Sequence, residues 1–168
     1  PEGHKALADF IKGAKFSFVS SNVNFSKDPN LKGLFSDLIS SKPKEGKIYN
    51  GIVKEIDGEK VGFFGLTTAE TRDISNPGAV TFEDYIEEAK KAVRAFEGMG
   101  VNKIVAITHI GYDDNPAVDN DLHLAAQVEG IEAMTLSSNS ILGGFIMQLS
   151  VKQPDGSVDM RSKSFLHT

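Results

Sequence analysis

The strongest constraint on the fold is an amphipathic helix pattern that leads directly into an apolar run. Apolar side chains recur at helical spacing on one stripe, at Phe82, Tyr85, Ile86, Ala89, Ala92, Val93 and Phe96. Thr81 is placed to cap this helix, and Gly98 or Gly100 to end it. Residues 103–108 then read as a strand buried in a parallel sheet. Since a helix followed by such a strand is the basic connection of α/β folds, we expect an α/β domain.

The N-terminal third carries weaker patterns. Leu7, Phe10 and Ile11 share one face of a short helix expected over residues 4–12, with Gly13 as its cap. Residues 15–20 alternate as in a strand. Apolar residues at helical spacing predict a second helix over 31–39, namely Leu31, Leu34, Phe35, Leu38 and Ile39.

Turn signals predict two hairpins. Strands over 48–56 and 61–66 flank Asp57-Gly58, and strands over 145–152 and 157–166 flank a Pro-Asp-Gly turn at 154–156. A short helix over 122–128 lies between them, capped by Asp119 or Asp121 and closed by Gly130. No repeat or linker divides the 168 residues, so we expect one domain over 1–168.

Composition excludes several classes of function. A net charge of −5 without a basic block disfavours binding to a nucleic-acid duplex. No apolar run reaches the ~18 residues of a membrane span. The absence of cysteine removes disulfides, thiolate nucleophiles and cysteine zinc sites, so any metal must use oxygen and nitrogen ligands. Sequence motifs for a P-loop, a serine hydrolase and a dinucleotide fold are also missing.

Polar residues follow three of the expected strands. They are Asn22 and Asn24, then Thr67, Thr68 and Glu70, then Thr108 and His109. If these strands are parallel neighbours, their carboxyl ends meet at one edge, where open α/β sheets bind ligands. Asn22 and Asn24 could orient a phosphate or simply form Asx-turns.

His109 is the main candidate for chemistry. A neutral imidazole at a strand end could bind a divalent metal or move a proton; the alternative is a hydrogen-bonded core histidine. We expect His4, His123 and His167 to be solvated. For the aspartates at 113, 114, 119 and 121, helix capping and solvation explain the cluster better than calcium binding, because the EF-hand spacing is absent.

Four segments together resemble one known family. They are residues 20–23 (SSNV), 61–68 (VGFFGLTT), 107–111 (ITHIG) and 121–131 (DLHLAAQVEGI). In order and spacing these segments resemble the 5'-nucleotidase family of calcineurin-like metallophosphoesterases, over roughly residues 1–131.

The resemblance implies a fold, a reaction and a site. The fold would be part of a four-layered α/β/β/α sandwich, a mixed sheet with β-hairpins. The complete protein would hydrolyse nucleotide phosphomonoesters with two divalent metal ions. His109 falls on a family metal ligand, Asn22 lies close to the family site, and Asn24 and Thr108 are expected near the substrate or its phosphate. Location would be extracellular, cell-surface or periplasmic.

The chain also departs from the family pattern. The first metal motif (Asp-x-His), the bridging Asp and the Asn-His-Glu motif with the catalytic His would lie before Pro1, so no catalytic residue is expected in this chain. The final Gly-Gly-His-Ser-His motif should follow Ile131, but residues 132–140 contain no histidine. We therefore expect a fragment that needs the remainder of its domain. The alternatives are an inert binding or structural module that keeps the scaffold, and a small-molecule sensor.

Overall fold

The computed structural model describes residues 2–111, 119–136, 146–152 and 158–164. Its helices are α1 (Glu2–Gly13), α2 (Thr71–Ile74), α3 (Tyr85–Gly98) and α4 (Asp121–Gln127). Its strands are β1 (Phe18–Val19), β2 (Val23–Asn24), β3 (Phe35–Ser40), β4 (Ile48–Ile56), β5 (Glu59–Thr67), β6 (Thr81–Phe82), β7 (Lys103–His109), β8 (Ala133–Leu136), β9 (Ile146–Lys152) and β10 (Val158–Ser164). None of the helices in these ranges is long and apolar enough to cross a membrane.

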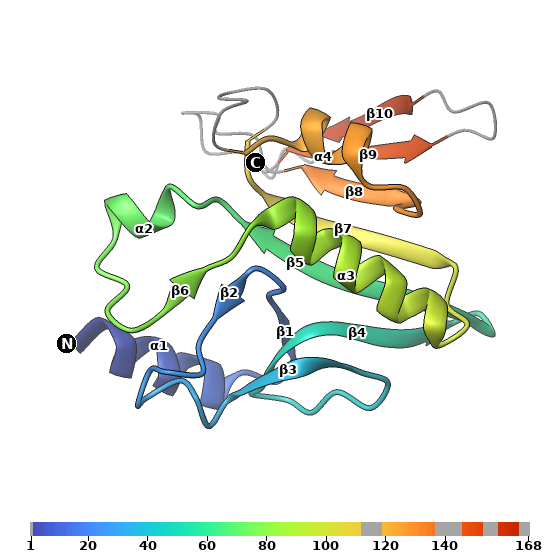
Figure 1. Cartoon of the computed structure of the whole chain (residues 1–168). Coiled ribbons are helices and arrows are strands. Elements are labelled where there is room, and N and C mark those ends of the chain that lie inside the picture. Colours follow the sequence, from blue (N-terminus) through green and yellow to red (C-terminus); the bar gives the residue numbers. More distant parts are fainter. Residues whose placement is uncertain (1, 112–118, 137–145, 153–157, 165–168) are drawn as a thin grey trace.

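One eight-stranded mixed sheet organises the molecule (Figure 1). Its order is β1-β4-β5-β7-β8-β9-β10, with β3 also paired to β4, while β2 and β6 form a separate two-stranded ribbon. β5, β7 and β8 run parallel to one another, whereas β4 is antiparallel to β5. The prediction of an α/β fold with a mixed sheet and hairpins is confirmed.

α3 and α4 lie on the same face of this sheet and bury the main core (Figure 1). Phe96 of α3 is completely buried, and its ring lies directly on the backbone of two glycines. A Cβ atom added at Gly51 or Gly62 would come within 2.8 or 2.7 Å of that ring. The missing side chains therefore create the space that brings α3 close to the sheet.

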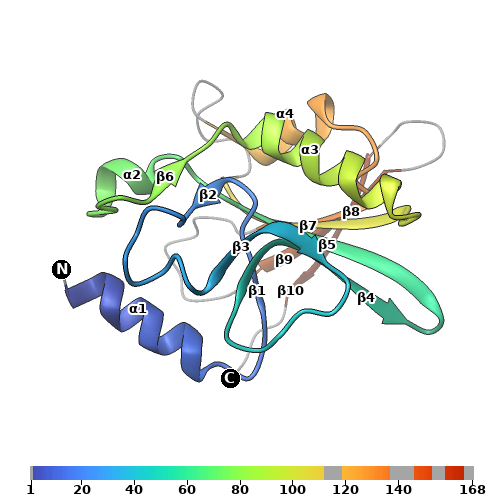
Figure 2. The same ribbon diagram turned by 60° about the horizontal axis from the view of Figure 1, so that its bottom comes forward.

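α1 belongs to a second, smaller core, on the side of the molecule away from α3 and α4 (Figure 2). The side chains that α1 buries in this core are Ala8 and Ile11, which pack with Leu31, Leu34 and Ile48. The helix is where the sequence predicts it, but its buried face is displaced: Leu7 and Phe10 are 43% and 61% exposed.

The central hairpin is confirmed. β4 and β5 pair from Ile56↔Glu59 to Gly51↔Phe64 across a two-residue turn. Asp57 and Gly58 both have positive φ, at 51° and 80°, which is the backbone that such tight hairpin turns require. The C-terminal hairpin is confirmed as β9 and β10, which pair antiparallel. Its turn lies outside the described residues, as do residues 137–145, which include part of the segment where the final family motif was expected.

Two expectations about the N-terminal half are wrong. Residues 31–39 are not a helix, because Leu31 and Leu34 are buried in a turn held by the Asp28 side chain, and β3 then pairs with β4. Thr81 does not cap α3 either. It pairs with Asn24 in the β2–β6 ribbon, and the cap is Asp84, whose carboxylate accepts from Glu87 N–H at 2.8 Å. In both cases tertiary strand pairing overrides a local helical pattern.

Candidate functional site

His109 is the last residue of β7 and its side chain is exposed, so the core-histidine alternative does not hold. Its partner in the parallel register is Thr67, the last residue of β5. The next residue, Thr68, donates its N–H to the His109 carbonyl oxygen at 2.9 Å. The imidazole therefore projects from a strand end whose backbone is fixed by its neighbour.

Asn22 is completely buried beneath this edge. Its Nδ2 donates to the Thr67 carbonyl oxygen at 2.8 Å, and its Oδ1 accepts from the Thr67 N–H at 2.9 Å. Asn22 thus acts as a backbone partner for the end of β5. It lies at the same edge as His109, one strand away through Thr67.

The strand before Asn22 was expected to be a parallel neighbour of the strands that end at Thr67 and His109, and this expectation is wrong. β1 is parallel to β4, which is antiparallel to β5, so β1 is not a parallel neighbour of β5 and β7. The chain instead crosses to β5 after β1, where Ser21 N–H donates to the Gly65 carbonyl oxygen at 2.7 Å. Gly65 is required for this approach, because a Cβ there would lie 2.5 Å from the Val19 carbonyl oxygen.

Thr108 is buried on the opposite face of β7 from the His109 side chain, as alternation along a strand requires. Its hydroxyl donates to the Thr135 carbonyl oxygen of β8 at 2.8 Å. This geometry makes Thr108 a link between two strands.

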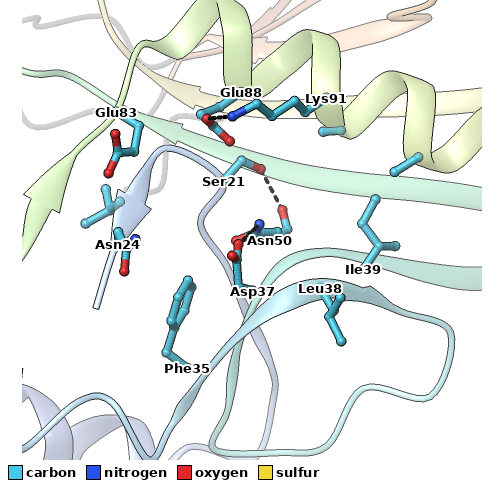
Figure 3. Close-up of a pocket in the computed structure, with 13 residues that line it drawn as sticks. Ser21, Asn24, Phe35, Asp37, Leu38, Ile39, Asn50, Glu83, Glu88 and Lys91 are labelled. Atoms are coloured by element: carbon cyan, nitrogen blue, oxygen red, sulfur yellow. Dashed lines mark hydrogen bonds and ion pairs between the residues drawn. The ribbon is translucent and has the colours of Figure 1, made fainter. Parts of the chain in front are cut away.

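Asn24 lies elsewhere, in a cavity of about 430 Å³ between α3, β2 and β3 (Figure 3). Its Oδ1 accepts from Ser26 N–H at 3.0 Å, which is the Asx-turn alternative. Three carboxylates line the cavity, at Asp37, Glu83 and Glu88, and its single lysine, Lys91, is paired with Glu88 at 2.5 Å. Such a lining repels a phosphate group, so the surroundings favour the turn interpretation for Asn24.

Asp119 was expected to be a solvated or capping residue, and this expectation is wrong. It is 4% exposed, and its carboxylate accepts from the Thr68 hydroxyl at 3.0 Å and from Ala69 N–H at 2.7 Å. The cap of α4 is Asn120, whose Oδ1 accepts from His123 N–H at 2.6 Å. Sequence reasoning missed both roles; in this chain no local signal links Asp119 to residues 68 and 69.

Asp121 is also buried, at 2% exposure, where the sequence predicted a solvated or capping carboxylate. Burial raises the pKa of Asp121 to about 7. The Thr108 hydroxyl and the Asp119 carboxylate act on this pKa in opposite directions, the first lowering and the second raising it. Neither Asp121 oxygen has a hydrogen-bond partner within the described residues. The Asp121 carboxyl therefore exchanges its proton near neutral pH.

His4 is not solvated as expected. Its Nδ1 lies 2.5 Å from an Asp28 carboxylate oxygen, and its Nε2 donates to the Asn76 carbonyl oxygen at 2.9 Å. The hydrogen bond with Asp28 is the main reason that the pKa of His4 is raised. His123, in contrast, is exposed as predicted, and His167 lies outside the described residues.

The capacity of this edge to hold metal can be judged from its donors. His109 offers an exposed imidazole, a ligand that suits divalent transition metals. Within the described ranges, however, no three His, Asp or Glu side chains lie close enough together to hold an ion. The described residues thus fit one ligand of a metal centre and do not complete one.

Comparisons with known proteins identify the class. The chain is 36% identical over 151 residues to the trifunctional nucleotide phosphoesterase protein YfkN of Bacillus subtilis (strain 168), covering 78% of this chain and 10% of that protein. It is 33% identical over 129 residues to the snake venom 5'-nucleotidase of Naja atra, covering 76% of this chain and 21% of the venom enzyme. No family model matches.

A solved structure agrees in sequence and fold. The 5'-nucleotidase precursor from Thermus thermophilus superposes with a TM-score of 0.67 and 37% identity, over 94% of this chain and 29% of that one. The fold is that of a calcineurin-like metallophosphoesterase. Within that class, the chain belongs to the 5'-nucleotidase family. It spans well under half of the length of each of these relatives.

Proposed function

We propose that this chain forms the C-terminal half of a metallophosphoesterase domain that hydrolyses nucleotide phosphomonoesters. The observation that carries the proposal is the exposed imidazole of His109 at the end of β7, fixed in register with Thr67. Family membership supports the reaction class, and the names of the relatives supply the nucleotide substrate.

In this proposal His109 is one ligand of a divalent metal centre. Such metals activate water and neutralise charge on the transferring phosphoryl group, and in two-metal sites they lie about 3.5–4 Å apart. The contribution of this chain is to fix the backbone position from which the imidazole projects. The Asn22 side chain makes two hydrogen bonds to the backbone of Thr67, which is the register partner of His109. The Thr108 hydroxyl links β7 to β8.

The remaining ligands and the catalytic histidine are proposed to come from the rest of the domain, since the described residues supply one imidazole at this edge and no cluster of three ligands. The donors that this chain can contribute are nitrogen and oxygen atoms rather than thiolates, because it has no cysteine. An extracellular, surface or periplasmic location is part of the proposal and is supported by the venom and precursor relatives.

The test is phosphate release by the complete protein from a nucleoside 5'-monophosphate, measured with added Mn²⁺ and after chelation. We expect release only with metal, and a loss of at least about 100-fold in His109→Asn, since removing a metal ligand removes transition-state stabilisation. His123→Asn is the matched control, because His123 is exposed on α4. Equal activity of the parent and His109→Asn would refute the assignment.

A second candidate is an inert module that keeps the scaffold without a metal centre. The lack of three clustered ligands within the described part of the chain favours it for this chain taken alone. It predicts no metal uptake by calorimetry and no phosphate release by this chain, whatever the complete protein does. Under this candidate His109→Asn leaves the activity of the complete protein unchanged, which separates it from the first proposal.

A further inference from the structure

Asp119 is a buried carboxylate that has no role in the proposed function described above. Its two oxygens are used by one short segment, with Oδ1 accepting from the Thr68 hydroxyl at 3.0 Å and Oδ2 from Ala69 N–H at 2.7 Å. Asp119 lies 51 and 50 residues along the chain from these partners. These contacts join the segment after β5 to the segment before α4, which are far apart in the sequence.

The segment that Asp119 holds is also the one that holds His109. Thr68 N–H donates to the His109 carbonyl oxygen at 2.9 Å, and Thr67 is the register partner of His109. Asp119, Thr68 and His109 therefore form a continuous series of contacts. One end is a buried carboxylate, and the other is the residue that bears the exposed imidazole.

Two further contacts fix Asp119 itself. The next residue, Asn120, caps α4 through His123 N–H, and Asp121 N–H donates to the Gly111 carbonyl oxygen at 2.8 Å. The backbone just after His109 is thus tied to the start of α4, beside Asp119. Since Asn120 already performs the capping, Asp119 is not needed as a helix cap and its carboxylate serves residues 68 and 69.

We propose that Asp119 is a positioning residue for His109, acting through Thr68 and Ala69 to fix the strand end from which the imidazole projects. The expected effect on metal affinity rests on the proposed function. The positioning itself rests only on the contacts of Asp119, Thr68 and Ala69. Outer residues that orient a metal ligand are commonly worth about 10- to 100-fold in affinity or activity.

The test uses the complete protein and a small set of variants. Asp119→Asn keeps the shape but replaces one acceptor oxygen with a donor. Thr68→Val removes the hydroxyl, and with it the bond to Asp119 and the bond accepted from Glu70 N–H, and Thr68→Ser restores the hydroxyl. Asp73→Asn is the matched control, because the Asp73 side chain is 68% exposed and pairs only with the adjacent Arg72 among the described residues.

Two readouts are measured for each variant: the dissociation constant for Mn²⁺ alone, and the NMR signals of the His109 ring without metal. We expect Mn²⁺ binding to weaken about 10-fold or more in Asp119→Asn and Thr68→Val. The ring signals should shift in the same two variants. Thr68→Ser should recover most of the affinity that Thr68→Val loses, and Asp73→Asn should leave both readouts unchanged.

The inference is overturned if folded Asp119→Asn binds Mn²⁺ like the parent with unchanged ring signals. Should Asp119→Asn fail to fold, the comparison of Thr68→Val with Thr68→Ser decides in the same way. If the parent binds no Mn²⁺, the proposed function fails, and the ring signals alone then decide the inference: a shift in Thr68→Val reversed in Thr68→Ser supports it, and no shift refutes it.

Discussion

Asn22 and Thr67, which lie 45 residues apart in the chain, are joined by two hydrogen bonds between one side-chain amide and one residue's backbone. Both atoms of the Asn22 amide group are used, and the residue is completely buried. Because Thr67 is paired with His109, this contact lies directly behind the imidazole that we assign to the metal centre.

Replacing Asn22 should destabilise the fold strongly. Asn22→Ala leaves the Thr67 N–H and carbonyl without their partner, and each unsatisfied buried group costs about 1–3 kcal/mol, so we expect a loss of about 2–6 kcal/mol. Urea denaturation measures it. Asn24→Ala is the control, since it removes only an Asx-turn bond to Ser26 and should cost less than about 1 kcal/mol. Equal losses for the two variants would contradict the assigned role of Asn22.

Gly65 should tolerate no side chain. Gly65→Ala places a Cβ 2.5 Å from the Val19 carbonyl oxygen, which forces the crossing segment away from β5. Overpacking of this kind costs about 1–3 kcal/mol. Gly98→Ala is the control, because Gly98 in α3 has nothing within 4 Å of an added Cβ and alanine favours a helix by about 0.5–1 kcal/mol. Thermal unfolding should therefore shift in opposite directions, and a shift in the same direction would refute this interpretation.

Asp121 should make stability depend on pH. Its pKa is raised from 3.8 to about 7 in the folded state, so the folded protein binds a proton that the unfolded chain releases. Stability should therefore fall as pH rises from about 4 to about 7, by about 4 kcal/mol for a difference of this size. In Asp121→Asn this slope should largely disappear, as measured by urea denaturation at several pH values. A slope identical to that of the parent would show that another group is responsible.

The contact between His4 and Asp28 gives a second loss of stability with rising pH, in a higher pH range. Hydrogen bonding to Asp28 raises the pKa of His4, so this stabilisation is complete below the ordinary histidine pKa of 6.5 and is lost as pH rises through the raised value. His4→Ala should cost about 1.5–3 kcal/mol at pH 6, because a bond to a buried charged partner is lost. The loss should shrink at pH 9. A loss that is equal at both pH values, measured by denaturation, would contradict the ionic character of the contact.

Local patterns were sufficient for the elements whose stabilisation is local. The Asp57-Gly58 turn fixes the β4–β5 hairpin. Helix α3 could be predicted from its apolar stripe, because all of the residues of that stripe lie in one continuous segment. β3 was missed because its strand form depends on pairing with β4, while its residues by themselves suit a helix. The same distinction applies to the site. His109 could be predicted from sequence because it directly follows an apolar strand segment, whereas the role of Asp119 depends on contacts with residues 68 and 69, about fifty positions earlier.

The most direct test of the central claim is a crystal structure of the complete protein grown with Mn²⁺, with the metal located by anomalous scattering. The account predicts an Mn²⁺ ion coordinated directly by a ring nitrogen of His109. A metal centre elsewhere in the protein, with the His109 ring in contact only with solvent, would contradict it.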